Sequence, residues 1–252
     1  MIFSITKKAI IATVLLVVFC AVGVVAVLNG DVQAVYNGKV ERKIPVYNVD
    51  RNDKLVALTF DAAWGGDKTE QILELLNKYG VKATFFLVGF WIDKYPELVK
   101  KIDEAGMEIG NHSKNHYNMS KLDDDTKCDE IDYVNAKIVE LTGKTPKFFR
   151  APFGDYNNAL MSVLEQKSMI GIQWDVDSLD WKGLSGQDIA KRTSKAKSGS
   201  IILCHNNSDN ILDAIPLIIS NLQNQGYKLV TMSELVYQEN YYIDNNGIQH
   251  LK

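Results

Sequence analysis

The chain has 252 residues and a formal net charge of −3, with 46% hydrophobic, 23% charged and 10% aromatic residues. This is the composition of an ordinary globular protein, and it excludes a disordered chain, a collagen and a disulfide-stapled miniprotein. Residues 1–50 carry five basic and three acidic groups, so residues 51–252 carry about −5 and no basic face for nucleic acid is expected. Of the three cysteines, Cys20 lies in a long apolar run, and Cys204 follows Ile201–Leu203 and is predicted to be a buried hydrophobe.

The N-terminus is predicted to carry an export signal. Lys7 and Lys8 precede twenty uncharged residues, 9–28, which as a helix would span the roughly 30 Å core of a bilayer. The positive-inside rule places residues 1–8 in the cytoplasm and the bulk of the chain outside. A run of this length favours a retained single-pass signal-anchor, and cleavage after Ala34, which would release a secreted protein, is the alternative. Residues 29–50 have no sustained period and are predicted to be a linker.

From Lys54 onward, short β-rich runs alternate with longer helical stretches. Residues 55–60 are predicted to form a strand, which is followed by a helix with apolar residues at 72, 75, 76 and 79 and by a strand at 84–88. Further strands are expected at 107–110, 147–150, 169–176, 200–204 and 228–230, with helices between them. This alternation predicts a parallel sheet, either closed as a barrel or open and doubly wound.

Reactive side chains stand where the expected strands end. They are Asp61 after the first strand, His112 and His116 after the third, Arg150 at the end of the fourth, Asp177 and Asp180 after the fifth, and His205 at the end of the sixth. Because the carboxyl ends of parallel strands meet at one face, we expect these side chains to form one active site.

Five short motifs carry a family resemblance. They are Thr59–Ala62 (TFDA), Asn111–His116 (NHSKNH), Arg150–Gly154 (RAPFG), Asp177–Trp181 (DSLDW) and Leu203–His205 (LCH). In this order they resemble the polysaccharide deacetylases that share the NodB homology domain, carbohydrate esterase family 4, and Trp64-Gly65 resembles the sporulation-associated PdaB branch. The resemblance implies an α/β fold, an irregular seven-stranded (β/α) barrel at 51–237, and leaves 238–252 as a C-terminal tail.

The two histidines of the second motif are candidate metal ligands. His112 and His116 are four residues apart, so a helical turn would place both imidazoles on one side to hold a divalent metal, for which zinc is the first candidate and cobalt or manganese are alternatives. The resemblance implies a second aspartate directly after the first as third ligand, and this chain has Ala62 there. Two histidines alone would hold metal weakly, unless Asp67, Asp155 or a substrate oxygen completes the set.

The resemblance also assigns catalytic roles. Asp61 is expected to be the general base that takes a proton from the attacking water, with Arg150 as its ion-pair partner. The backbone N–H of Phe153 is expected to stabilise the oxyanion. His205 is expected to protonate the departing amine, and Asp180 to raise the pKa of its imidazole.

Further residues in and beside these motifs are candidates for other roles. Asp177 is a second candidate for the partner of His205, or caps the loop. Leu203 and Trp181 would wall a pocket for the acetyl methyl, and Trp181 could also stack on a sugar ring. Trp64, Trp91 and Trp174 are expected in the core or at its rim.

The leading hypothesis is a membrane-tethered, metal-dependent deacetylase that removes N-acetyl groups from an exported polysaccharide such as cell-wall peptidoglycan. The alternative, motivated by Ala62, is a weakened or inactive protein of the same fold that binds cell-wall glycan. A third hypothesis treats Asp61, His112 and His116 as a two-histidine, one-carboxylate iron site.

Overall fold

The computed structural model describes residues 42–252. The expected cytoplasmic segment 1–8 and membrane segment 9–28 lie outside the described residues. Within 42–252, no helix is both long and apolar enough to cross a bilayer. Residues 43–252 form one compact unit.

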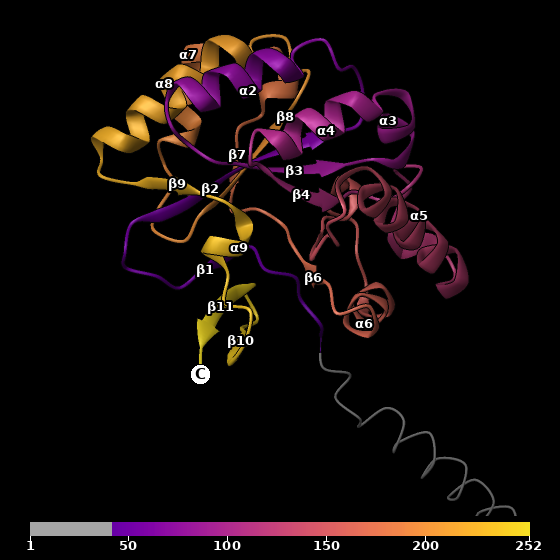
Figure 1. Cartoon of the computed structure of the whole chain (residues 1–252). Coiled ribbons are helices and arrows are strands. Elements are labelled where there is room, and N and C mark those ends of the chain that lie inside the picture. Colours follow the sequence, from indigo (N-terminus) through magenta and orange to yellow (C-terminus); the bar gives the residue numbers. More distant parts are fainter. Residues whose placement is uncertain (1–41) are drawn as a thin grey trace, which may run out of the picture. The chain divides into compact units, whose positions relative to one another are not determined.

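A curled parallel sheet forms the centre of this unit (Figure 1). Its order is β6 (Ile170–Gly171), β5 (Phe148–Phe149), β4 (Glu108–Asn111), β3 (Thr84–Leu87), β2 (Leu55–Ala62), β8 (Ile201–His205) and β7 (Val176–Asp177). An eighth strand, β9 (Lys228–Val230), pairs with the first residues of β2. The parallel α/β architecture predicted from the alternation is confirmed, and the sheet curls into a half-barrel.

Helices connect these strands. They are α2 (Thr69–Lys78), α3 (Gly89–Lys94), α4 (Pro96–Glu104), α5 (Asp124–Thr142), α6 (Asn158–Gln166), α7 (Gly186–Thr193), α8 (Ile211–Asn224) and α9 (Met232–Leu235). Their ends follow local chemistry: the Asp123 carboxylate accepts the Thr126 N–H at the start of α5, and Gly143 ends this helix with a left-handed φ of 70°. Figure 1 shows α2, α4 and α8 along one side of the sheet.

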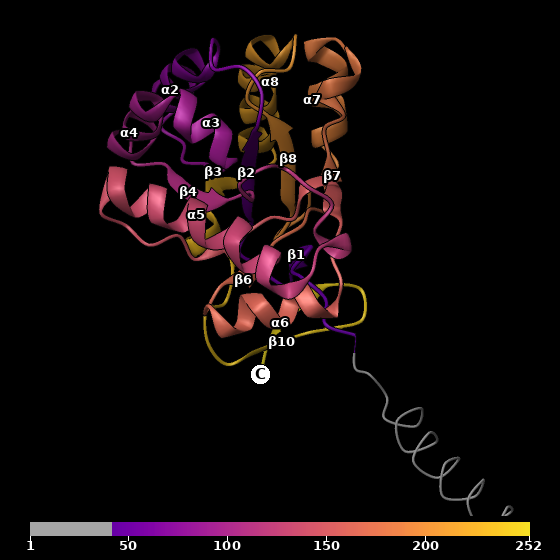
Figure 2. The ribbon, with the colours of Figure 1, turned by 90° about the vertical axis from the view of Figure 1, so that its right-hand side faces the viewer.

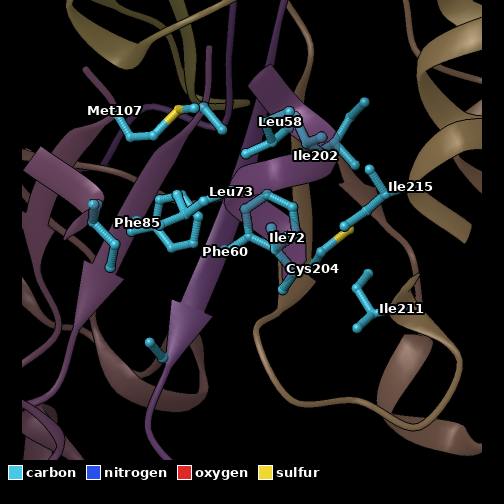
Figure 3. Packing of buried hydrophobic residues seen from close by; sticks show 14 of the residues in the cluster. Leu58, Phe60, Ile72, Leu73, Phe85, Met107, Ile202, Cys204, Ile211 and Ile215 are labelled. Carbon is cyan, nitrogen blue, oxygen red and sulfur yellow. The ribbon is translucent and has the colours of Figure 1, made fainter. Parts of the chain in front are cut away.

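The main core lies between the sheet and these helices. Side chains alternate along β2, so Val56, Leu58 and Phe60 belong to the cluster shared with the helices, whereas Ala57 belongs to a second cluster on the other face. Figure 3 shows Phe60 of β2 among side chains of neighbouring strands and helices. Cys204 is fully buried in the same cluster, as predicted.

The strand expected at 169–176 is two strands. Its first part, β6, pairs with β5, and its last part, β7, pairs with β8, so the two parts lie at opposite edges of the curled sheet. Between them, the Gln173 N–H donates to the carbonyl of Val46. The single strand prediction is therefore wrong, because the backbone of 169–176 changes its hydrogen-bonding partner between its two ends.

Both ends of the compact unit extend beyond the boundaries 51–237 expected from the sequence. β1 (Asn48–Val49) pairs with β11 (Ile248–Leu251), which also pairs with β10 (Tyr241–Ile243) in a second sheet. Val46 is fully buried and forms a bridge to Ile172. Residues 43–50, expected in the linker, and the expected tail are thus packed onto the rest of the unit. Figure 2 shows β10 at the end of the molecule opposite α7 and α8.

Candidate active site

The two expected proton-transfer residues face each other across neighbouring strands. Asp61 of β2 and His205 of β8 are partners in the parallel register. Strands pair about 4.8 Å apart, so the two residues start from adjacent backbone positions. The Asp61 side chain is only 8% exposed, whereas 33% of the His205 side chain is open to solvent. The site therefore combines one buried carboxylate with one accessible imidazole.

A buried ion pair holds the Asp61 carboxylate. Arg150, which follows β5, donates from Nη1 to Asp61 Oδ1 at 2.6 Å and from Nη2 to the carbonyl of Gln173 at 3.2 Å. The guanidinium also lies 4.1 Å from the ring centre of Phe86. Burial raises the pKa of Asp61, but the positive charge of Arg150 and the hydrogen bond that it donates lower it, and the net pKa is lowered. Asp61 is therefore ionised and fixed in direction at neutral pH.

Asp180 is the carboxylate that partners His205. Its Oδ1 lies 2.7 Å from His205 Nδ1, and its Oδ2 accepts the backbone N–H of His205 at 2.7 Å and the hydroxyl of Ser208 at 2.9 Å. Burial lowers the pKa of His205, but the hydrogen bond and charge of Asp180 outweigh it and the net pKa is raised. Asp177, the second candidate, instead accepts the Leu179 N–H at 2.8 Å and caps the loop.

The structure brings His112 and His116 together without the expected helix. Their ring centroids are 5.0 Å apart, but β4 ends at Asn111 and a loop follows in which Ser113 and His116 have left-handed φ values of 66° and 58°. Side chains bind this loop's backbone: Asn111 Oδ1 accepts the Ser113 N–H, and Ser113 Oγ accepts the His116 N–H. Such bonds compete with a helical turn, which is why the helix prediction is wrong.

The His112 imidazole has the form that a metal ligand needs. Its Nδ1 lies 2.7 Å from the carbonyl oxygen of Arg150, which assigns the proton to Nδ1 and leaves a lone pair on Nε2. Burial lowers the pKa of His112, and it is the main cause that lowers the pKa of His116 to about 4, so both rings are neutral at pH 7. The bare Nε2 lies 3.4 Å from Asp61 Oδ2, so a metal cation held by His112 would also weaken the repulsion between the lone pairs of these two atoms.

His112 and His116 lack a third ligand. Ala62 is fully buried among apolar residues of the main core cluster. Of the two proposed substitutes, Asp155 accepts both the backbone N–H and the hydroxyl of Ser120, and Asp67 is exposed. Within residues 42–252, no three His, Cys, Asp or Glu side chains form a group that could hold a metal ion. His112 and His116 could therefore ligate a metal as neutral imidazoles, but no third protein ligand in residues 42–252 is positioned beside them.

Three further predicted site residues lie around these groups. Phe153 has a left-handed φ of 59° in the turn after Arg150, and its ring is exposed and lies 4.5 Å from the His116 ring. Trp181 follows the buried Asp180 and is also exposed. Leu203 is buried on β8, and the two-residue period of a strand places it on the same face as His205.

Several supporting residues escaped the sequence analysis because they lie outside the five motifs. The buried carboxylate of Glu130 on α5 accepts the backbone and side-chain N–H groups of Asn115, and thereby holds the loop between the two histidines. Ser208 completes the hydrogen bonds to Asp180, and the Lys68 ammonium donates to the Ser208 carbonyl at 2.7 Å. Only the position of Ser208, three residues after His205, could have drawn attention to it.

Comparison with known proteins finds relatives that match most of this chain. The model of the polysaccharide deacetylase family matches residues 48–170. A peptidoglycan-N-acetylglucosamine deacetylase of Bacillus cereus is 37% identical over 202 residues, which cover 78% of this chain and 73% of that protein. The uncharacterized protein YlxY of Bacillus subtilis is 36% identical over 193 residues, 76% of this chain, and the chain spans 60% of its length.

A solved structure is similar over most of the described residues. The crystal structure of a CE4 family pseudoenzyme from Bacillus anthracis matches with a TM-score of 0.74 and 33% identity, covering 82% of this chain and 73% of that one. A mutant of the same pseudoenzyme, with restored enzymatic activity, matches with a TM-score of 0.73 and 36% identity, covering 76% of this chain and 70% of that one. The relatives thus include both deacetylases and a pseudoenzyme.

Proposed function

Because the chain belongs to the polysaccharide deacetylase family, we propose that it removes N-acetyl groups from a polysaccharide, with cell-wall peptidoglycan as the substrate. The choice of peptidoglycan follows from the B. cereus relative, a peptidoglycan-N-acetylglucosamine deacetylase. The observation that carries the proposal is the presence of two neighbouring pairs at the ends of β2 and β8. In one pair Arg150 holds the carboxylate of Asp61, and in the other Asp180 holds the imidazole of His205.

These pairs supply the two proton transfers that amide hydrolysis requires. The ionised Asp61 takes a proton from water as the water oxygen bonds to the acetamide carbon. The carbonyl oxygen becomes negative, and the Phe153 backbone N–H is the proposed donor to it. His205, held protonated by Asp180, gives a proton to the amide nitrogen as the C–N bond breaks. Acetate and a free amine on the sugar are the products.

A divalent metal, with zinc as the first candidate and cobalt or manganese as alternatives, would be held by His112 and His116, and when bound it would lower the pKa of the water and polarise the carbonyl. The neutral state of both imidazoles supports this assignment. Because the chain has Ala62 where the family pattern has an aspartate, we propose that the metal is held weakly and that deacetylation is slow without added metal.

Binding of cell-wall glycan without turnover is the second candidate function. It is supported by the absence of an assembled three-ligand group within residues 42–252 and by the similarity to the B. anthracis pseudoenzyme. In this case the exposed Trp181 and Phe153 would contact the sugar, and Asp61 and His205 would serve only as polar groups of the binding surface.

The place of action is also a proposal. Lys7 and Lys8 before the uncharged run 9–28 support export, with the catalytic domain outside the membrane and the run kept as its anchor. The sporulation context implied by the resemblance to the PdaB branch stays a prediction.

Acetate release from purified peptidoglycan tests the proposed function. We expect the full chain to release acetate slowly, to release it faster as zinc, cobalt or manganese is added, and to release none above background after His205→Ala. Equal acetate release by the native chain and His205→Ala at every metal concentration would contradict deacetylation by this site. Peptidoglycan sedimentation with both proteins then identifies the binding-only alternative.

A further inference from the structure

Lys68 stands at the start of α2, where the chemistry of a helix end disfavours a lysine. Lys68 is the N-cap residue of this helix, and its side chain makes no capping hydrogen bond. N-caps favour Ser, Thr, Asp or Asn, whose side chains accept a backbone N–H, and the N-terminus of a helix carries a partial positive charge. A residue that breaks a local preference in this way often serves a contact outside its own element.

The ammonium group of Lys68 reaches the loop that follows β8. It donates to three consecutive backbone carbonyls, those of Asn207, Ser208 and Asp209, at 3.5, 2.7 and 3.1 Å. An ammonium group has three N–H donors, so one side chain can serve all three acceptors. Lys68 is therefore an internal cation for the backbone of the loop directly after His205.

Neutral hydrogen bonds join the same two loops. The side-chain N–H groups of the buried Asn206 donate to the carbonyl of Gly65 at 2.9 Å and to the hydroxyl of Thr69 at 3.2 Å. The backbone N–H of Asn206 donates to the carbonyl of Asp61 at 3.2 Å. The segment after the proposed base and the segment after the proposed acid are thus bound to each other, and Lys68 adds charge-assisted bonds to this connection.

Ser208 connects the loop to the partner of His205. The Oδ2 atom of Asp180 accepts the backbone N–H of His205 at 2.7 Å and the hydroxyl of Ser208 at 2.9 Å, while its Oδ1 lies 2.7 Å from His205 Nδ1. Both donors to Oδ2 therefore come from β8 and the loop that Lys68 holds. Because Asp180 is buried, a lost donor leaves an unsatisfied carboxylate oxygen, and the carboxylate is free to turn away from the imidazole.

We propose that Lys68 is a positioning residue for the proton donor His205, and that it acts by fixing Ser208 against the Asp180 carboxylate. A displacement of about 1 Å in a reacting geometry can lower a rate by up to roughly 10²-fold. The effect on turnover rests on the proposed function, whereas the anchoring of the loop is measured independently of it.

The first test is the kinetics of acetate release from peptidoglycan by the full chain at saturating metal. Lys68→Met should lower kcat roughly tenfold and leave KM unchanged, because Lys68 orients the acid and does not contact the substrate. Lys82→Met is the matched control: the Lys82 ammonium also donates to a backbone carbonyl, that of Ala105 at 2.6 Å, but it precedes β3, at the other end of the strands. Its kcat should equal that of the native chain.

A double-mutant cycle tests whether Lys68 acts through Ser208. Ser208→Ala should by itself lower kcat, and Lys68→Met should then cost little more in the Ser208→Ala background. The same loss from Lys68→Met in both backgrounds would contradict the proposed route. Native kcat in Ser208→Ala would overturn the proposal, even if Lys68→Met does not fold.

The second test is amide hydrogen exchange, which does not depend on turnover. In Lys68→Ala the amides of 206–210 should exchange roughly tenfold faster than in the native chain, and methylammonium should restore their protection, because it supplies N–H donors to the freed carbonyls. Tetramethylammonium, which has the same charge and no N–H, should not.

Equal exchange of 206–210 in the native chain and Lys68→Ala would overturn the anchoring by Lys68. Failure of the deacetylase proposal is a separate result. A native chain that releases no acetate at any metal concentration, but shows the methylammonium-dependent protection in Lys68→Ala, would contradict turnover and leave the anchored loop in place.

Discussion

Replacement of Asp61 by asparagine should lower the rate of acetate release by roughly 10²–10⁴-fold. The amide keeps the shape of the side chain but cannot take a proton from water. Acetate release from peptidoglycan at saturating metal is the measurement. A variant that keeps a third or more of the native rate would show that another group is the base.

This substitution also disturbs a buried ion pair, so stability must be measured with rate. Arg150 is fully buried beside Asp61, and removing the charge of one partner of such a pair costs about 3–5 kcal/mol. Asp175→Asn provides the control: this carboxylate accepts the Ile201 N–H and the Ser200 hydroxyl near the start of β8, away from the reacting groups. It should lower the melting temperature and leave the rate nearly unchanged.

The second large effect concerns pH. His205 acts as an acid only while protonated, and its pKa is raised above 6.5 by Asp180, so activity should be high below that raised pKa and lost as pH rises through it. In Asp180→Asn, burial of the imidazole is opposed only by the smaller contributions of Asp61 and Asp177, and the pKa of His205 should fall below 6.5. At pH 7.5 the rate should then drop on the order of 10²-fold.

The pH dependence of kcat/KM and an NMR titration of the His205 ring measure this effect. The alkaline limb of the profile and the ring pKa should move to lower pH together. The free energy of unfolding depends on pH in the same direction. The stability contributed by protonated His205 is fully present below pH 6.5 and is lost as pH rises through its folded-state pKa. An unchanged alkaline limb in Asp180→Asn would mean that His205 is not the acid.

The sequence predicted the parallel strands well because their apolar runs are buried on both faces and end at polar side chains. It missed the second sheet because strands such as β1, with two residues, carry no period of their own. β1 is held by its pairing with β11 and by a bridge from Asn48 to Ser200. On β11, the fully buried Gln249 side chain bonds the backbone N–H and carbonyl of Tyr237. Such long-range polar contacts leave no local pattern.

In the candidate site, too, the sequence predicted some features and missed those that depend on long-range contacts. Asp61, Arg150, Asp180 and His205 could be placed from strand ends and motifs. The path of the loop between His112 and His116 could not, since it depends on Glu130, a carboxylate on α5 that looks like any charged helical residue. The sequence also left Trp64 as core or rim, whereas its ring is exposed and lies 4.9 Å from the His116 ring of the candidate site.

The central question is whether Ala62 limits deacetylation by weakening metal binding, or whether the native site binds metal tightly without a carboxylate at position 62. Zinc should bind the native chain weakly and Ala62→Asp at least tenfold more tightly, because the variant restores the anionic ligand that the family pattern has at this position. Since position 62 is fully buried, the added carboxylate is costly without metal, and zinc should raise the melting temperature of this variant most. Ala63→Asp, the same change one residue further on, is the control.

The most direct measurement is therefore a calorimetric zinc titration of the native chain, Ala62→Asp and Ala63→Asp, with acetate release from peptidoglycan followed in the same samples. The account predicts tighter zinc and faster acetate release for Ala62→Asp alone. Tight stoichiometric zinc and full turnover in the native chain, with no gain in Ala62→Asp, would contradict it.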